Sequence, residues 1–392
     1  MGEIQAAFGM SAEVLDAAGA HWTAREILQQ PQVWGQIAAQ LTQARAELED
    51  FLAPWLQLPD LRIVLSGAGT SSYVGECLAP VLTRTLGRRV EAIATTDLVA
   101  SAGSWLSAGT PTLLVSFARS GNSPESAAAV EIVESYVKRC AHLVVTCNAQ
   151  GALNQRVRTL ANARAIVLPE VTNDRSFAMT SSFTGMLLAA AAAFGAVTAG
   201  EIEAVAARTA AWIPTCRPLL EELVRARFQR VVYLGSGALK GLAREAALKM
   251  LELSDGQVIA AADSTLGFRH GPKTILNERS LVVVFLCSDA HARRYDLDLV
   301  TELTREAVAG RVITVAAAQV PGAQPFDVVL PGIEGPAPLT DLTLCMAYAP
   351  FAQSLAMLSS LALGISPDTP NAAGTVSRVV QGVTIYPWRE TR

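Results

Sequence analysis

The stretch that decides the fold is Ile63-Val64-Leu65-Ser66-Gly67-Ala68-Gly69-Thr70-Ser71-Ser72, at residues 63–72. A short β-branched run ends there in a turn with two glycines, and hydroxyl side chains lead from the turn into a helical pattern. This strand–turn–helix pattern is typical of a parallel sheet whose strands are joined by crossover helices. The glycines allow a tight turn, and the hydroxyls together with the free N–H groups of the next helix suit an anion.

The same pattern returns in the second half of the chain. The run 231–234 is followed by Gly-Ser-Gly at 235–237, and 231 − 63 gives an offset of 168. The next predicted strands, at Leu113 and Leu281, differ again by 168, and two further strand pairs differ by 169 and 162. A nearly constant offset indicates an internal duplication. The alternative is that any two α/β halves align loosely in this way.

We therefore predict an α/β protein with two tandem, doubly wound parallel sheets and helices on both faces of each. A chain of 392 residues is too long for one ordinary core and suits two domains. Residues 1–50 are rich in helix-forming side chains and are expected to form an N-terminal helical segment. The predicted first domain covers residues 51–205 and the second covers residues 206–392.

The charge and cysteine patterns exclude several classes of protein. Lys plus Arg total 31 and Asp plus Glu total 35, without charge blocks, which argues against nucleic-acid or anionic-membrane partners. The longest apolar run, 186–197, is shorter than the ~20 residues of a membrane span. The six cysteines include no C-x-x-C pair, and no metal-ligand spacing is visible. We expect a cytoplasmic protein with buried, reduced thiols and no metal.

Three hydroxyl-rich segments of the first half are candidates for binding a phosphate group. They are 66–72, 116–125 and 179–182, and they follow strands or open a helix, where ligands of open parallel sheets bind. The alternative is that these hydroxyls are only helix caps; Ser123 fits an N-cap and Pro124 a first helical turn. No P-loop and no complete G-x-G-x-x-G occurs, which favours a small phosphorylated metabolite over a nucleotide. The candidate binding residues are Gly69, Thr70, Ser71, Arg119, Ser120, Asn122, Ser123, Thr180 and Ser181.

The candidates for acid–base chemistry lie in the second half. In a predicted helix, Glu245, Lys249 and Glu252 fall at i, i+4 and i+7 and therefore on one face. The alternative is a solvated face that carries an ordinary ion pair. His270, between Phe-Arg and Gly-Pro, is the best acid–base candidate among the four histidines, because functional residues concentrate on irregular loops.

The sequence as a whole resembles a protein with two tandem sugar isomerase (SIS) domains. The likeness is to the galactosamine-6-phosphate deaminase/isomerase family, also called the tagatose-6-phosphate ketose/aldose isomerase family, and runs from about Thr23 to Pro387. The motifs that carry it are Ser116–Glu125, Asn173–Thr184, Leu266–Lys273 and Gly382–Pro387.

The resemblance extends to the isomerase half of glucosamine-6-phosphate synthase and implies roles for individual residues. It implies phosphate loops at 69–71 and 120–123, and a proton-shuttling glutamate at Glu252. It further implies the helix lysine at Lys249 and a ring-opening histidine at His270. In that family the histidine reaches the site from a neighbouring subunit. The resemblance thus implies a homodimer or tetramer with shared active sites.

Two positions depart from the pattern of the synthase. Ala118 replaces the first serine of the usual S-x-S-G loop, and the lysine that can form a Schiff base falls near Gln381. The chain also shows no room for the synthase's N-terminal glutaminase, which favours the deaminating direction.

The resemblance implies an isomerising deaminase of an amino-sugar 6-phosphate, and D-galactosamine 6-phosphate giving D-tagatose 6-phosphate plus ammonia is the expected reaction. No cofactor is expected, because no redox step is needed. One alternative is a ketose/aldose isomerase without deamination. Another is a sugar-phosphate-sensing regulator, against which the first 50 residues show no basic recognition helix.

Overall fold

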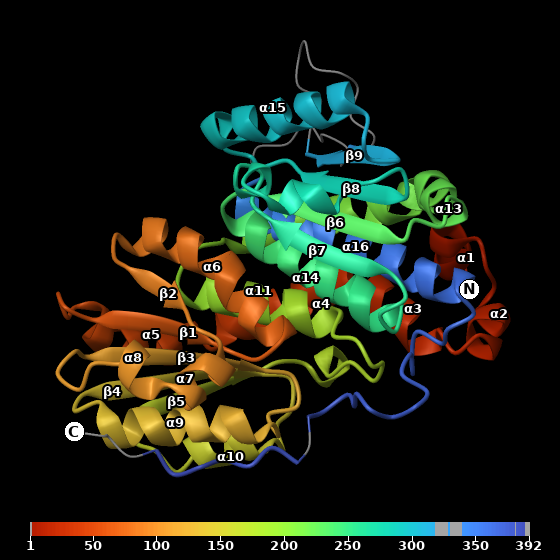
Figure 1. Cartoon of the computed structure of the whole chain (residues 1–392). Coiled ribbons are helices and arrows are strands. Elements are labelled where there is room, and N and C mark those ends of the chain that lie inside the picture. The colour runs from red at the N-terminus through yellow and green to blue at the C-terminus, as the bar shows by residue number, and fades with distance from the viewer. Residues whose placement is uncertain (1, 318–327, 330–338, 381, 389–392) are drawn as a thin grey trace. The chain divides into compact units, whose positions relative to one another are not determined.

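A computed structural model describes residues 2–317, 328–329, 339–380 and 382–388 (Figure 1). The chain divides into two compact units that interleave along the sequence. Unit A comprises Gly35–Asn173, Ser182–Thr198 and Gly374–Arg392. Unit B comprises Met1–Trp34, Asp174–Ser181 and Ala199–Ala373. Each unit is built on its own parallel sheet.

The sheet of unit A has the strand order β2-β1-β3-β4-β5, and every pair is parallel. All seven residues of β3 are buried, as expected for a central strand covered on both faces. The core under α9 includes Val64, Leu114, Val130 and Val144. The elements are α4 (Gln30–Gln43, shared with unit B), α5 (Arg45–Leu56), β1 (Arg62–Ser66), α6 (Thr70–Leu86), β2 (Val90–Ala92), α7 (Thr95–Ala100), α8 (Ala102–Trp105), β3 (Thr112–Ala118), α9 (Pro124–Tyr136), β4 (Cys140–Thr146), α10 (Ala152–Val157), β5 (Ala163–Val167), η1 (Glu170–Thr172) and α11 (Ser181–Ala193).

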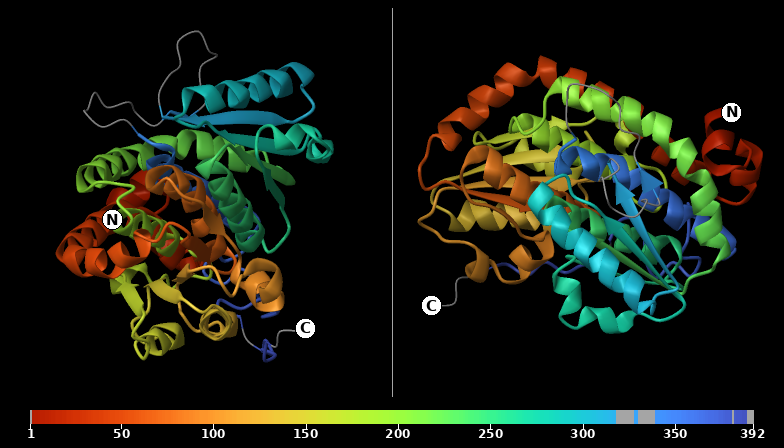
Figure 2. Two further views of the ribbon diagram at one scale, coloured as in Figure 1. Left: turned by 90° about the vertical axis from the view of Figure 1, so that its left-hand side faces the viewer. Right: turned by 90° about the horizontal axis from the view of Figure 1, so that it is seen from above.

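The sheet of unit B has the order β10-β9-β8-β6-β7, again with every pair parallel. Helix α15 packs on β9 (Figure 2). The elements are α1 (Gly2–Phe8), α2 (Ala12–Ala17), α3 (His21–Leu28), α12 (Ala199–Trp212), η2 (Ile213–Cys216), α13 (Arg217–Arg225), β6 (Arg230–Gly235), α14 (Ala238–Leu253), β7 (Ile259–Asp263), η3 (Gly267–Arg269), η4 (Pro272–Ile275), β8 (Ser280–Phe285), α15 (Ala290–Glu306), β9 (Arg311–Ala316), β10 (Val328–Val329) and α16 (Asp341–Ala362).

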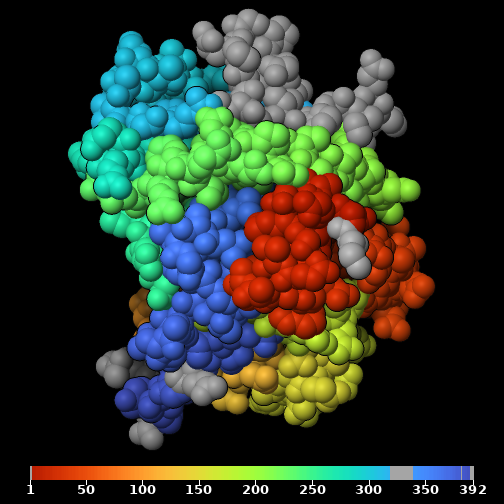
Figure 3. All heavy atoms as spheres, turned by 90° about the vertical axis from the view of Figure 1, so that its right-hand side faces the viewer, coloured from red at the N-terminus to blue at the C-terminus, as the bar shows by residue number. Residues whose placement is uncertain are grey.

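Helix α16 is the central helix of unit B. It packs against α12, α13 and α14, and also against α3 at the N-terminal end of the chain (Figure 3). By length and composition α16 would pass as a membrane span, but 94% of its apolar window is buried inside the structure. We therefore interpret its apolar surface as core packing of unit B.

The two sheets have the same topology. Strands β6, β7, β8, β9 and β10 take the same places in the sheet of unit B as β1, β2, β3, β4 and β5 take in the sheet of unit A. Ile63 pairs with Leu113 in unit A and Val231 with Leu281 in unit B, so that both partners keep the 168-residue offset. The turns agree as well, because Gly69 has φ 57° and ψ −130° and Gly237 has φ 57° and ψ −127°. The predicted α/β class with two parallel sheets is confirmed.

The compact units do not follow the sequence halves. Helices α1–α3 and the segment Asp174–Ser181 belong to unit B, although the latter lies inside the predicted first domain 51–205. One physical reason is Glu26 of α3, whose carboxylate accepts hydrogen bonds from Ser176, 150 residues further along the chain. The predicted boundaries near residues 50 and 205 describe the sequence repeat and stay a prediction.

The turn after β1 gives a test of the fold. A Cβ on Gly67 would stand 2.5 Å from the backbone carbonyl oxygen of Ser71, where neither atom can move freely. We expect Gly67→Ala to lower the free energy of unfolding by roughly 1–3 kcal/mol, as overpacking does. Gly35→Ala is the control, because Gly35 is exposed in α4 with nothing near its Cβ position. That change should raise stability by up to about 1 kcal/mol. Equal denaturant midpoints for the two variants would contradict the tight turn.

Candidate active site

The loop after β1 presents hydroxyls at the start of a long helix. Thr70 and Ser71 are buried at the N-terminus of the 17-residue α6, directly after the left-handed Gly69. The N–H of Thr95 donates to the carbonyl of Gly67 at 2.8 Å and holds the turn in place. The two buried hydroxyls and the partial positive charge of the helix end make this loop suited to a phosphate group.

The loop after β3 is held by hydrogen bonds to its own backbone and side chains. The carbonyl of Ser120 accepts from Asn148 Nδ2 at 2.8 Å, and Ser120 Oγ accepts from the Asn122 N–H at 3.3 Å. Asn122 Oδ1 accepts from the N–H of Ala152, the first residue of α10, at 3.0 Å. The Asn122 side chain therefore shapes the loop, whereas the Ser120 hydroxyl keeps its own proton to donate.

Ser123 and Arg119 lie at the two ends of this loop. Ser123 occupies the predicted N-cap position of α9, with Pro124 as the first helical residue, but its side chain makes no capping hydrogen bond to the helix backbone. Its Oγ lies 2.7 Å from Ser126 Oγ instead. Arg119 is buried and donates from Nη2 to the carbonyl of Arg378 at 2.7 Å. This guanidinium thus ties the loop to the C-terminal segment of unit A.

The third predicted segment, around Thr180 and Ser181, is fixed by Asp174. The Thr180 N–H donates to Asp174 Oδ2 at 2.8 Å, and the Ser181 hydroxyl donates to Oδ1 of the same carboxylate. Gln29 of α3 donates to Ser181 Oγ at 2.9 Å. Thr180 Oγ1 is buried and makes no hydrogen bond to any residue that the structure describes. Of the two hydroxyls, that of Thr180 is therefore the one left to bind a ligand.

Beneath this segment lies a second carboxylate, Glu26, which sequence reasoning missed. The Ser176 hydroxyl and the Ser176 N–H donate to Glu26, which lies on α3 and is almost fully buried. Burial, and then the neighbouring Asp174 carboxylate, raises the pKa of Glu26 to about 7. Asp174 itself lies in the quoted motif 173–184, but no sequence signal joins α3 to it.

Helix α14 brings the three predicted charged residues together. Lys249 Nζ lies 3.5 Å from Glu245 Oε1 and forms a close ion pair with Glu252 Oε2. The side chains of Lys249 and Glu245 are 1% and 2% exposed, whereas that of Glu252 is 26% exposed. The interpretation as a solvated helix face is therefore wrong. Lys249 is a buried cation between a buried and an accessible carboxylate.

His270 lies on an exposed loop that is fixed by its neighbours. Arg269 Nε binds Glu302 at 2.9 Å and Arg269 Nη2 binds Asp298 at 2.7 Å, while Lys273 binds Glu306 at 2.7 Å. All three acidic residues lie on or beside one face of α15. The His270 imidazole itself makes no hydrogen bond to any residue in the described ranges. Unit B therefore holds the loop firmly and leaves the imidazole exposed.

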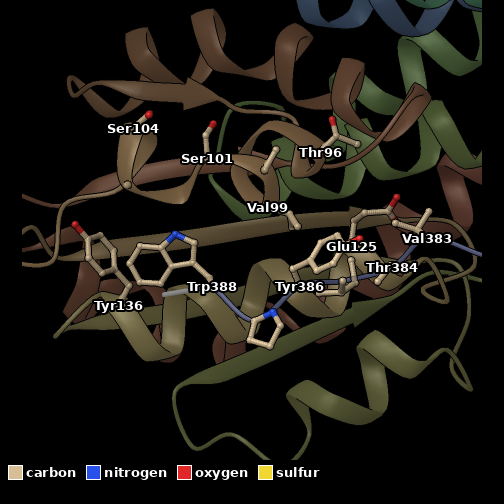
Figure 4. Close-up of a pocket in the computed structure, with 14 residues that line it drawn as sticks. Thr96, Val99, Ser101, Ser104, Glu125, Tyr136, Val383, Thr384, Tyr386 and Trp388 are labelled. Atoms are coloured by element: carbon tan, nitrogen blue, oxygen red, sulfur yellow. The ribbon is translucent and has the colours of Figure 1, made fainter. Parts of the chain in front are cut away.

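The C-terminal segment of unit A lines a pocket of about 870 Å³ (Figure 4). Trp388 packs edge-on against Tyr136 of α9 with ring centroids 4.6 Å apart. Glu125, at the start of α9, and the tail residues 383–388 line the pocket together with α7 and α8. The sequence motif at 382–387 thus lies close to the helix that follows the loop of Ser120. Gln381, expected near the Schiff-base position, lies outside the described residues.

One cluster of possible metal ligands also occurs, although none was expected. Glu134, Cys140 and His142 place their ligand atoms within 4.8 Å of one another. The atoms are hydrogen-bonded already, since Glu134 Oε1 lies 2.8 Å from His142 Nε2 and 3.2 Å from Cys140 Sγ. Burial, and then Glu134, raises the pKa of Cys140 to about 12, so that the thiol stays protonated at neutral pH. We interpret the cluster as a hydrogen-bonded structural feature.

The buried lysine of α14 gives a prediction with a matched control. Lys249→Met would remove the cation that lies 3.5 Å from the buried Glu245 carboxylate, and removing one partner of a buried pair costs roughly 3–5 kcal/mol. Lys240, on the same helix, is 47% exposed and lies 4.0 Å from Asp263. Lys240→Met should change the free energy of unfolding by less than about 0.5 kcal/mol. Urea unfolding measures both, and a small effect at Lys249 would contradict its role as a buried cation.

The raised pKa of Glu26 predicts a pH-dependent stability. Its pKa lies near 7 in the folded chain and near 4.5 in the unfolded chain, so the folded state binds more protons between these values. The contribution of protonated Glu26 to the free energy of unfolding is therefore fully present below pH 4.5. This contribution falls by about 3 kcal/mol as the pH rises to 7. Glu26→Gln should remove this slope, and Glu3→Gln, exposed on α1, should keep it. Parallel curves for wild type and Glu26→Gln would contradict the shift.

Comparisons with known proteins show the family to which the chain belongs. The SIS domain family matches residues 59–196. The D-galactosamine-6-phosphate deaminase AgaS of Escherichia coli is 44% identical over 378 residues, covering 95% of this chain and 97% of that protein. The protein of the same name from Shewanella sp. (strain ANA-3) is 42% identical over 388 residues, covering 97% of this chain and 95% of that protein. The crystal structure of tagatose-6-phosphate ketose/aldose isomerase from Escherichia coli superposes with a TM-score of 0.87 at 41% identity, covering 94% and 97% of the two chains. The chain therefore belongs to the D-galactosamine-6-phosphate deaminase AgaS family.

Proposed function

We propose that this enzyme is an isomerising deaminase that converts D-galactosamine 6-phosphate to D-tagatose 6-phosphate and ammonia. The observation that carries the proposal is the 44% identity to an enzyme of that name over nearly the whole of both chains. The charged face of α14 supports it, because an accessible carboxylate beside a buried cation suits proton transfer next to a developing negative charge.

The proposed reaction assigns one step to each charged residue. His270 protonates the ring oxygen of the sugar so that the ring opens. Glu252 then takes the proton from C2 and returns it to C1, while Lys249 stabilises the negative charge that develops on oxygen. The product of this transfer is an imine at C2. Water adds to it, the C–N bond breaks, and ammonia leaves as the ketose forms.

The proposed phosphate ligands lie in the three hydroxyl-rich segments. The first proposed ligands lie at the start of α6 and are Gly69, Thr70 and Ser71. The next is Ser120, whose hydroxyl accepts a hydrogen bond from the Asn122 N–H and keeps its own proton to donate. Thr180 presents a second buried hydroxyl without a partner in the described part of the chain. Binding energy at the phosphate then positions the reacting carbons. Arg119, Asn122, Ser123 and Ser181 shape these segments, as their hydrogen bonds indicate.

The assignment of the reaction has one competitor with support. A structure named tagatose-6-phosphate ketose/aldose isomerase shares the fold at 41% identity. The same Glu252 would serve a plain ketose/aldose isomerase, because proton transfer between C1 and C2 is common to both reactions. Release of ammonia distinguishes the two.

The first test of the function is an ammonia assay with two substrates. Purified enzyme with galactosamine 6-phosphate should release ammonia and a ketose phosphate in equal amounts, and glucosamine 6-phosphate should react more slowly. Glu252→Gln should lower turnover by roughly 100- to 10,000-fold, because the amide keeps the shape but cannot accept a proton. Its substrate affinity should stay within a few-fold of wild type. Conversion of an aldose 6-phosphate to its ketose, with no ammonia released from either amino-sugar phosphate, would favour the plain isomerase.

We further propose that the two sheets arose by internal duplication. The identical strand order, the 168-residue register offset and the matching Gly69 and Gly237 turns support this proposal. The boundaries 51–205 and 206–392, after an N-terminal helical segment, are then the limits of the repeats. We also propose a cytoplasmic homodimer or tetramer with shared active sites. The exposure of His270 on its loop supports the shared site.

Mixed refolding tests the shared site. Glu252→Gln and His270→Asn proteins, each nearly inactive, are unfolded, mixed and refolded together. If the two residues serve one site from different chains, a mixed dimer holds one intact site, and roughly a quarter of wild-type activity should return for random closed dimers. If both residues come from one chain, every site keeps a defect. A mixture that stays inactive, with dimers confirmed by mass, would exclude the shared site without affecting the assigned reaction.

A further inference from the structure

Unit B contains a pocket of about 290 Å³ at the edge of its sheet where the strands begin. Residues at the starts of β6, β7 and β8 line it, together with residues from the C-terminal parts of α13, α14 and α16. None of the residues proposed for catalysis or for phosphate binding is among the lining residues. The pocket is therefore not part of the active site as proposed above.

The floor of the pocket is apolar. Five elements each contribute a side chain that is at most 3% exposed, namely Leu223, Val231, Met250, Leu281 and Leu355. Small-molecule pockets in proteins are lined mainly by such side chains, with a few polar groups that orient the ligand. These side chains offer no hydrogen bond to a sugar hydroxyl, so the floor suits an apolar chain.

The polar lining residues are exposed or partly exposed and lie at the rim of the pocket. They are Arg227, Arg279, Gln229, Gln257 and Ser359. None of the described lining residues is acidic, and neither arginine forms an ion pair with an acidic side chain in the described ranges. Two guanidinium groups at the rim of an apolar floor complement a ligand that has a negatively charged end and an apolar body.

Arg227 has a backbone conformation that favours glycine. It follows Ala226, the C-cap of α13, has φ 50°, and its N–H donates to the carbonyl of Val224 at 3.2 Å. Glycine is the usual residue in this left-handed position at a helix end, because a Cβ strains the backbone there. An arginine at this position is therefore unfavourable for the fold, and strain of this kind clusters at functional sites.

Arg279 is held in place by Gln229. In the amide orientation that its surroundings require, Gln229 Oε1 accepts from Arg279 Nη1 at 2.8 Å and from Arg279 Nη2 at 3.1 Å. The Gln229 N–H also donates to the carbonyl of Arg279 at 3.0 Å. A guanidinium carries more N–H donors than this one oxygen can accept, so the remaining donors can bind a carboxylate. Because the side chain is already ordered, less conformational entropy is lost on binding.

We propose that this pocket is a second ligand site, which binds a small aliphatic carboxylate. The apolar chain lies on the floor, and the carboxylate binds Arg227 and Arg279 at the rim. The volume of about 290 Å³ corresponds to roughly ten non-hydrogen atoms, at the ~30 Å³ that a water molecule takes up in the liquid. Octanoate has this size and serves as the probe.

Isothermal titration calorimetry with octanoate tests the second site. Wild type should bind one octanoate per chain. 1-Octanol keeps the chain but lacks the charge, and butyrate keeps the charge but has a shorter chain, so each should bind at least roughly tenfold more weakly. Inorganic phosphate should not compete, because it has no apolar body. The measurement needs no turnover, so a failure of the proposed reaction would leave its result unaffected.

Two arginine variants have a matched control on the same segment. Arg279→Gln should weaken octanoate binding by at least about tenfold, since a charged hydrogen-bond donor is lost. Arg227→Gly should weaken it likewise, yet its unfolding temperature should equal or exceed that of wild type, because glycine fits the left-handed backbone. Arg225 is exposed at the end of α13 and does not line the pocket, so Arg225→Gln should bind octanoate as wild type does.

Filling the pocket gives a variant that keeps both arginines. Ser359→Phe places an aromatic ring in the pocket from α16 and should abolish octanoate binding. The proposal is overturned if folded wild type binds no octanoate at millimolar concentration, or if 1-octanol binds as tightly as octanoate. It is also overturned if Arg225→Gln loses as much affinity as Arg279→Gln. If a variant fails to fold, the comparison of the three probes on wild type decides the proposal.

Discussion

The fold of this enzyme depends on a strand that turns into a helix across two glycines, once in each half. At Gly67 and at Gly235, a backbone carbonyl of the following helix approaches to 2.5 Å from where a Cβ would be. No other residue type fits there without displacing the helix. The tight turn places the first N–H groups of α6 and α14 at the edge of each sheet. The phosphate site proposed for the first half depends on this placement.

The two halves use the same turn in different ways. In the first half the hydroxyls of Thr70, Ser71 and Ser120 bind no carboxylate of the described chain, so an external anion can take them. In the second half Ser288, which matches Ser120 by the 168-residue offset, donates to Asp341, whereas Ala238 and Leu239 stand where the first half has Thr70 and Ser71. The proposed substrate-binding loops and the proposed acid–base residues thus lie in two halves that share one strand order. The halves differ in the side chains that follow their strands.

The sequence predicted the parallel sheets and the charged face of α14, because both follow from local periodicity. The 168-residue offset also reappears in the strand register. Burial was not predictable in the same way. The i, i+4 spacing of Glu245 and Lys249 is shared by ordinary surface pairs, and only packing of α14 against α16, about 100 residues away, makes this pair a buried one. For the same reason the carboxylates of Glu26 and Asp341 gave no signal, since their partners are distant in sequence.

The arrangement of charges on α14 supports the part proposed for a buried lysine in proton transfer. A lone buried ammonium would be costly, and it would tend to lose its proton. Glu245, equally buried at 3.5 Å, supplies the balancing charge. Lys249 thus lies between this buried carboxylate and the partly exposed carboxylate of Glu252. In the proposed reaction the accessible Glu252 carboxylate carries the proton from C2 to C1, and Glu245 is a positioning residue that holds Lys249 without touching the substrate.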